Sequence, residues 1–240
     1  MWDAFISVMI TILLYIYDLI GQNFGLAIII FTILIRLLLY PLTVRQIKSS
    51  KAMQELQESQ KWKDIQKKYK DDRETLAQKQ MEIYQEMGIN PFGSCLPTLL
   101  QFPIIIGLYR AIILTLAVTP VELLNLSKYI SNGADLIPIN SQFLWMELSE
   151  PERLPILGVG VPVLAIIVLV TSYLQTKLIS TGPQPGAEEG GQAAQMSRAM
   201  TLYMPIFMGY LALTFASGLA VYFIASNLVS ILQYAIMGKI

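Results

Sequence analysis

The sequence predicts an all-α integral membrane protein: five transmembrane helices around a hydrophilic groove open to the cytoplasm, a cytoplasmic helical hairpin and an N-terminal interfacial helix. Three observations predict it. Of the 240 residues, 54% are hydrophobic and only 14% are charged, against about 25% charged residues in soluble proteins. Residues 44–88 hold 18 of the 34 charged residues. The rest contains apolar runs long enough to cross a hydrocarbon layer of ~30 Å.

Residues 1–22 predict an amphipathic helix lying flat on the outer face of the membrane. One stripe of this otherwise apolar segment is polar, at spacings of three and four residues: Asp3, Ser7, Thr11, Tyr15, Asp18 and Gln22. A helix with a single polar stripe can lie in the membrane interface. Because the stripe carries Asp rather than Lys, the outer surface is favoured. A sixth span is the alternative.

Four apolar segments predict five transmembrane helices. The segment after residue 200 is too long for one span, and Ser217-Gly218 near its middle predicts a turn between two helices. The predicted spans are 23–43, 90–118, 156–178, 201–216 and 218–238.

The charged segment 44–89 predicts two antiparallel helices that project from the membrane. The first runs from Val44 to Tyr69, and Asp71 with Glu74 predicts the N-terminal cap of the second. Gly88 ends that helix. The alternative is a solvated charged surface without a partner.

The distribution of Lys and Arg predicts the orientation. Residues 44–88 contain ten basic residues, which places them in the cytoplasm. Residues 119–155 have two basic and five acidic residues and form an extracytoplasmic loop, whereas 179–200 form a flexible cytoplasmic loop. The N-terminus is then outside and the C-terminus is in the cytoplasm.

Missing residue types argue against an enzyme. The chain has no histidine and a single cysteine, Cys95. This excludes His-dependent catalysis, Cys–His nucleophiles and zinc clusters. We expect no metal, no cofactor and no nucleic-acid partner.

Arg36 is the sharpest feature within the spans. An arginine at the centre of a transmembrane helix costs about 2.5–3.5 kcal/mol on insertion scales. The spans contain no Asp or Glu to offset its charge. We therefore expect water, backbone or a visiting ligand to solvate Arg36. The alternative is that its side chain extends to the nearby interface.

Polar side chains recur on one face of three other spans. They are Ser94, Thr98 and Gln101 on the second, Thr171 and Gln175 on the third, and Tyr222, Ser226, Asn227, Ser230 and Gln233 on the last. Each stripe alone could be interhelical hydrogen bonding. Together, in the cytoplasmic half and around an unpaired arginine, they predict a wet groove that is closed outside. A half-channel of this kind suits a polypeptide being inserted; a lipid scramblase or a small-solute transporter is the alternative.

Several segments resemble the YidC-type insertases. They are FGLAIIIFTILIRLLLYPLTVRQIKSSKAMQELQ, NPFGSCLPTLLQFPIIIGLYRAI, FLWMELSEPERLPIL, SYLQTKL and SGLAVYFIASNLVSILQ, in the order of that family's core. The resemblance implies an insertase of a bacterial cell membrane with a five-span core like that of Gram-positive-type members. Arg36 matches the groove arginine, Gln175 a polar groove residue, and Tyr222-Phe223 an aromatic pair. The partners it implies are nascent membrane proteins, with the Sec translocon, the ribosome and the signal recognition particle receptor as further candidates.

Overall fold

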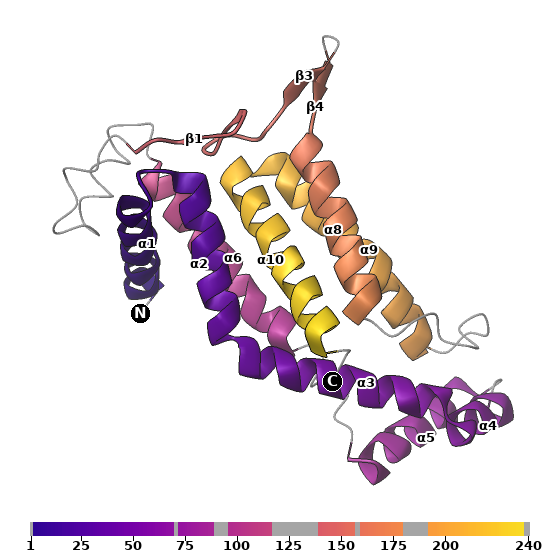
Figure 1. Cartoon of the computed structure of the whole chain (residues 1–240). Helices are drawn as coiled ribbons and strands as arrows, with labels where there is room; N and C mark the ends of the chain where they lie inside the picture. The colour runs from indigo at the N-terminus through magenta and orange to yellow at the C-terminus, as the bar shows by residue number, and fades with distance from the viewer. Residues whose placement is uncertain are drawn as a thin grey trace.

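The computed structural model is a bundle of helices with one long charged extension (Figure 1). The structure describes residues 2–69, 72–88, 96–116, 139–156, 159–179 and 192–237. Ser94 and Cys95, residues 117–138 and residues 180–191 lie outside the described residues, as does most of the predicted 179–200 loop.

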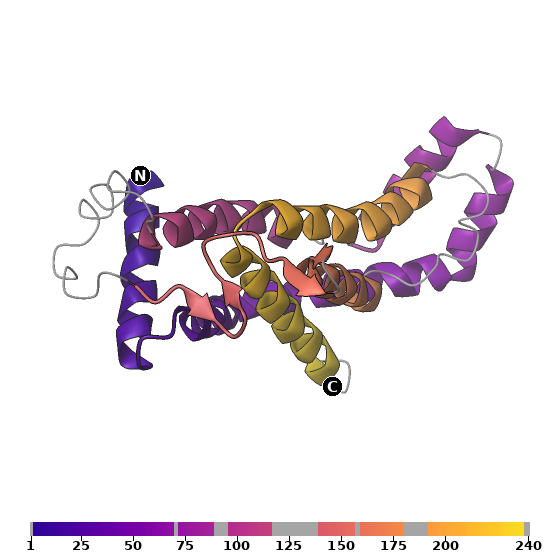
Figure 2. The ribbon, with the colours of Figure 1, turned by 90° about the horizontal axis from the view of Figure 1, so that it is seen from above.

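Within the described part of the chain, six helices form the bundle: α1 Trp2–Leu19, α2 Phe24–Leu38, α6 Leu96–Thr115, α8 Val163–Ile179, α9 Gln192–Thr214 and α10 Ser217–Met237. The α10 helix packs against α2, α6, α8 and α9. Figures 1 and 2 place α1 at one edge of the bundle and the α8–α9 pair at the other. The core is apolar, and Leu108, Ile112 and Leu219 are among its fully buried side chains. The turn predicted near Ser217 lies at Phe215–Ala216, directly before α10.

Among the described residues, α1 and α10 are long and apolar enough to cross a membrane, and α2 with α3 makes a third if the bent pair is one span. The shorter apolar stretches Gln101–Thr115, Val163–Leu178 and Leu202–Thr214 lie in α6, α8 and α9. The all-helical membrane architecture is therefore confirmed. The count of five spans stays a prediction.

The α1 helix is amphipathic, as its sequence pattern predicts. Its apolar side, including Ile10 and Leu13, packs on α2 and α6. The polar stripe faces away from the core: Asp3, Thr11 and Asp18 are exposed. Its length and composition also permit a span, so the flat orientation stays a prediction.

The predicted first span contains a helix break. The α2 helix ends at Leu38, and α3, Tyr40–Glu58, leaves it at an angle of 64°. Pro41 lies at the first turn of α3, where its missing N–H costs nothing, whereas within a continuous helix its ring would clash with the preceding turn. At 1.5 Å per residue the 15 residues of α2 extend only about 22 Å, less than the ~30 Å hydrocarbon layer.

The charged segment forms three helices rather than two: α3, α4 Gln60–Lys68 and α5 Arg73–Glu86. Ser59 ends α3 and caps α4, its hydroxyl accepting from the Trp62 N–H at 3.3 Å. The N-cap of α5 is Asp72 and not Asp71 as predicted, because Asp72 has extended backbone angles and accepts from the Thr75 N–H at 3.1 Å.

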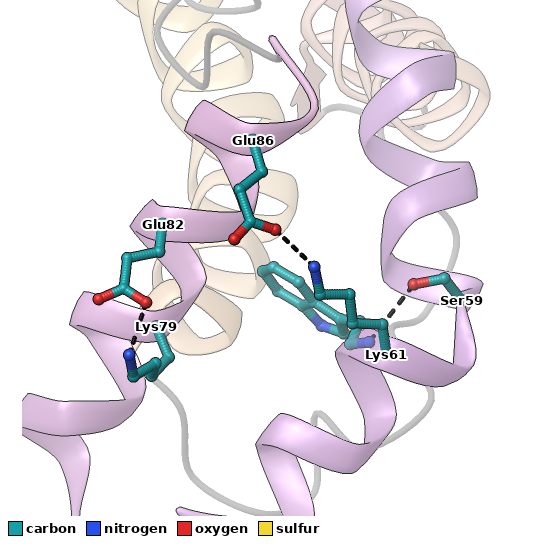
Figure 3. A network of polar contacts seen from close by, with 6 residues as sticks. Ser59, Lys61, Lys79, Glu82 and Glu86 are labelled. Atoms are coloured by element: carbon teal, nitrogen blue, oxygen red, sulfur yellow. Dashed lines mark hydrogen bonds and ion pairs between the residues drawn. The ribbon is translucent and has the colours of Figure 1, made fainter.

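A small apolar cluster holds this α3–α5 hairpin together: Leu56, Trp62, Ile83 and Tyr84 are buried, and Met53 and Ile65 pack on them. Ion pairs lie on the exposed surface of this hairpin (Figure 3): Lys61–Glu86 at 2.5 Å and Lys79–Glu82 at 2.6 Å. The predicted hairpin therefore has an internal core, which the bare charged surface of the alternative would lack.

Two short antiparallel β-hairpins lie at the end of the bundle where α2, α8 and α10 begin (Figure 1). They pair β1 Gln142–Phe143 with β2 Met146–Glu147, and β3 Leu154–Ile156 with β4 Val159–Val161. The helix of the third predicted span therefore begins at Val163 rather than at residue 156. Gly25 permits the close contact between β1 and α2, because a Cβ there would meet the Phe143 ring at 2.2 Å.

Candidate functional site

Arg36 lies in the last turn of α2, directly before the bend into α3. Its Nε donates to the Ser226 Oγ of α10 at 3.0 Å, and its Nη2 donates to the same oxygen. Ser226 is only 2% exposed. The carbonyl groups at the C-terminus of a helix carry partial negative charge, which favours a cation in this position. The guanidinium therefore contacts a neutral hydroxyl and lies near the C-terminus of its own helix.

The α10 helix supplies most of the surrounding polar groups. Tyr222, Ser226, Asn227, Ser230 and Gln233 are all buried, because their spacing of three and four residues places them on the side that faces α2, α6 and α8. The Gln233 Nε2 donates to the Arg36 carbonyl oxygen at 3.4 Å. Its Oε1 is buried without a hydrogen-bond partner among the described residues.

Neighbouring helices reach this face of α10 from two sides. From α6, the Gln101 Nε2 donates to the Tyr222 hydroxyl. From α8, Thr171 Oγ1 and Ser172 Oγ accept from the Asn227 Nδ2 at 3.1 and 2.9 Å. We call this group the Arg36 cluster: Arg36, Gln101, Thr171, Ser172, Tyr222, Ser226, Asn227, Ser230 and Gln233.

Most residues predicted for the site meet in the Arg36 cluster, but not all. Gln175 is half-buried one turn beyond Thr171 on α8. Phe223 belongs to the apolar core, with its ring centroid 5.8 Å from that of Tyr222. Thr98 lies in α6, but its side chain, like Ser94, falls outside what the structure describes.

Ser172 is the site residue that sequence reasoning leaves out. It is 5% exposed and shares the Asn227 amide with Thr171. Its position directly after Thr171 is the only signal in the sequence. Two adjacent residues of a helix differ by about 100° in direction, so both can contact one amide only where the partner helix crosses between them.

The Arg36 cluster contains one positively charged side chain and no acidic side chain. The bundle helices α2, α6, α8, α9 and α10 contain no Asp or Glu. Among the described residues, no group of three or more His, Cys, Asp or Glu could hold a metal ion. The cluster therefore offers hydroxyl and amide groups beside one positive charge.

Comparison with known proteins assigns the family. The sequence matches the family described as "60Kd inner membrane protein" over residues 15–240. The chain belongs to this family. Bacterial relatives include the membrane protein insertase YidC of Oceanobacillus iheyensis, 34% identical over 91% of this chain and 76% of that protein. The YidC of Fusobacterium nucleatum is 35% identical over 94% of this chain and 98% of that protein. The insertase MisCA of Bacillus subtilis is 35% identical over 97% of this chain and 77% of that protein.

A solved structure agrees with this family assignment. The fold is similar to the crystal structure of an active YidC insertase with its first transmembrane domain resolved, with a TM-score of 0.61 and 27% sequence identity. The match covers 98% of this chain and 46% of that chain. The family and the apolar helices together identify a bacterial membrane protein.

Proposed function

We propose that this protein is a membrane protein insertase that takes nascent membrane proteins into a polar groove and releases them laterally into the bilayer. The observation that carries the proposal is the Arg36–Ser226 contact, in which a cation within the bundle is met by a neutral hydroxyl. The insertase names of relatives at about 35% identity support the same function.

The Arg36 cluster is the proposed binding surface for the client. Arg36 attracts acidic or polar translocated segments, because α2 and the helices α6, α8, α9 and α10 carry no carboxylate that competes for its charge. Serine hydroxyls and side-chain amides can exchange hydrogen-bond partners readily, because each group can both donate and accept. The buried Gln233 Oε1 lacks a donor among the described residues, and a water molecule or a client N–H would satisfy it. Gln175 and Phe223 are proposed to extend the surface, and Ser94 and Thr98 are proposed members of it from their spacing in the sequence.

The proposed orientation places the α3–α5 hairpin and the C-terminus in the cytoplasm and residues 1–22 on the outer face. Support comes from the ten basic residues of 44–88. The short α2 and its bend at Leu39 would bring water close to Arg36 from the cytoplasmic side. Burial of the apolar client helix drives release into lipid, since each buried CH₂ contributes about 0.8 kcal/mol. The Sec translocon, the ribosome and the signal recognition particle receptor are proposed partners.

The test is insertion of a single-spanning client by proteoliposomes that contain the wild-type protein, Arg36→Ala or Arg36→Lys. Two clients are compared, which differ only in whether the translocated tail is acidic or neutral. Arg36→Ala should lower insertion of the acidic client about tenfold, which corresponds to about 1.4 kcal/mol of lost attraction. Arg36→Lys should retain most activity, because the charge is kept.

Equal insertion of the acidic client by Arg36→Ala and wild type, at matched protein levels, would contradict the electrostatic role. Lipid scrambling or solute flux without client insertion would contradict the insertase function itself.

A further inference from the structure

The turn of the first β-hairpin carries bulky apolar residues where a small residue would be easier to accommodate. Phe143 pairs with Met146, so Leu144 and Trp145 form a two-residue turn. Leu144 has a φ of +56°. Hairpin turns with positive φ at this position strongly favour Gly, Asn or Asp, and a branched side chain there is strained. The need to reverse the chain therefore does not explain why a leucine, rather than one of these residues, occupies position 144.

The same turn directs its side chains away from the protein. Leu144 is 74% exposed and Trp145 is 52% exposed. On either side of the turn, the side chains of Met146 and Leu148 are buried, and Phe143 packs on α2 at Gly25. The hairpin therefore has a well-held base and an apolar tip.

Backbone contacts fix this hairpin at the start of α10. The Ser217 N–H donates to the Glu150 carbonyl at 2.8 Å, and the Gly218 N–H donates to the Leu148 carbonyl at 3.1 Å. The Ser217 hydroxyl donates to the Glu147 carbonyl at 2.6 Å. These bonds satisfy N–H groups that the first turn of a helix otherwise leaves unpaired. The base of the β-hairpin is therefore held at the level where α10 begins.

One carboxylate joins the tip to the first turn of α8. The indole Nε1 of Trp145 donates to Glu152 Oε1 at 3.2 Å, and the Leu164 N–H in the first turn of α8 donates to Glu152 Oε2 at 3.1 Å. Two residues further on, the exposed apolar side of α8 begins with Ile166 and Ile167. The apolar tip thus continues the apolar surface of a membrane helix at its end.

We propose that Leu144 and Trp145 form a membrane anchor that inserts into the boundary between lipid headgroups and acyl chains at this end of the bundle. An indole suits this boundary because its ring is apolar and its N–H is polar. Glu152 positions the ring, and Leu144 adds apolar contact that offsets its unfavourable backbone angle. The inference is independent of the insertase proposal.

The experiment uses tryptophan fluorescence of the full chain in phosphatidylcholine vesicles. The protein has three tryptophans, so Trp2→Phe with Trp62→Phe leaves Trp145 alone, and Trp2→Phe with Trp145→Phe leaves Trp62 as the control. Lipids brominated near the headgroup should quench Trp145 about twofold more than lipids brominated near the chain end, as expected for an interfacial indole. Aqueous iodide should quench it weakly. Trp62, which is buried in the α3–α5 hairpin, should respond to neither lipid.

Strong quenching by iodide without quenching by brominated lipid would overturn the proposal, because the tip would then lie in water. Quenching by neither would also overturn it, because a protein surface would then cover the tip.

A second variant separates the anchor from the turn. Asn tolerates positive φ better than Leu, so Leu144→Asn in the Trp145-only protein should keep or raise Tm while quenching by brominated lipid falls. An unchanged quenching profile in Leu144→Asn would exclude Leu144 from the anchor.

Discussion

The Arg36 cluster and the α3–α5 hairpin handle charge in opposite ways. In the hairpin, Lys61 and Lys79 pair with Glu86 and Glu82, and every partner is substantially exposed. In the cluster, a single guanidinium contacts the Ser226 hydroxyl, and helices α2, α6, α8, α9 and α10 contain no Asp or Glu. Exposed ion pairs contribute little to stability because water screens them. A cation within a membrane helix costs about 2.5–3.5 kcal/mol on insertion scales, and a single hydroxyl partner does not neutralise its charge.

The two regions also differ in what holds them together. Trp62 and Leu56 form the buried centre of the hairpin, and its charged groups lie outside that centre. In the cluster, polar groups are themselves buried and join α10 to α2, α6 and α8. Polar substitutions should therefore have large effects in the cluster and small effects in the hairpin.

The largest effect is expected from giving Arg36 an acidic ion-pair partner, like those that Lys61 and Lys79 have in the α3–α5 hairpin. Ser226→Asp would place a carboxylate within reach of the guanidinium and form a partly buried ion pair. Insertion of a client with an acidic tail should fall about tenfold, equivalent to about 1.4 kcal/mol, while Tm is kept. The control is Ser226→Asn, which is similar in shape to Asp but neutral and should retain insertion. A fully active Ser226→Asp would show that the charge of Arg36 need not be available.

A smaller effect is expected from removing a link between α10 and α8. Asn227→Ala deletes hydrogen bonds to Thr171 and Ser172. The free energy of unfolding should fall by about 1–2 kcal/mol, since each such bond within a membrane contributes about 0.6 kcal/mol and the lost side chain leaves a gap. Denaturation in mixed micelles measures it. Leu228→Ala is the control, because Leu228 is exposed on the same helix; a loss as large in that variant would rule out the Asn227 bonds as the cause.

The smallest effect is expected in the hairpin. Lys61 lowers the pKa of Glu86 through a hydrogen bond and through its charge. A carboxyl whose pKa is lower in the folded state stabilises the fold above its unfolded pKa, and this contribution disappears as the pH falls through the folded-state pKa. Glu86→Gln should therefore leave Tm almost unchanged at pH 7 and remove a slight loss of Tm in acid. Salt should weaken the same contribution. A large drop in Tm at pH 7 would contradict the ranking of the two regions.

Much of this architecture is predictable from the sequence because the signals are periodic. The polar residues of α10 recur every three or four positions, which predicts a common face, and they do share one. The polar stripe of α1 and the turn before α10 follow in the same way. Such patterns depend on helix geometry alone.

The remaining features depend on contacts between segments far apart in the sequence. Ser226 meets Arg36 across 190 residues, and no local pattern identifies that pair among several serines. The break at Leu39 could be inferred from Pro41, but its angle depends on how α3 leaves the bundle. Asp71 and Asp72 are both suitable capping residues, and Glu74 three residues on favours Asp71, but the backbone angles select Asp72. The β-hairpins at 142–161 are too short to show an alternating pattern.

The central claim is that water reaches the Arg36 cluster from the cytoplasmic side. Thr171 and Val170 are neighbours on α8 at nearly the same depth, but Thr171 contacts Asn227 whereas Val170 is exposed on the apolar surface. In a Cys95→Ser background, Thr171→Cys and Val170→Cys are treated with a membrane-impermeant maleimide in vesicles of both orientations. Because thiols react as thiolates in water, residue 171 should be labelled from the cytoplasmic side alone, and residue 170 from neither side. An unreactive residue 171, or equal labelling of both positions, would contradict the account.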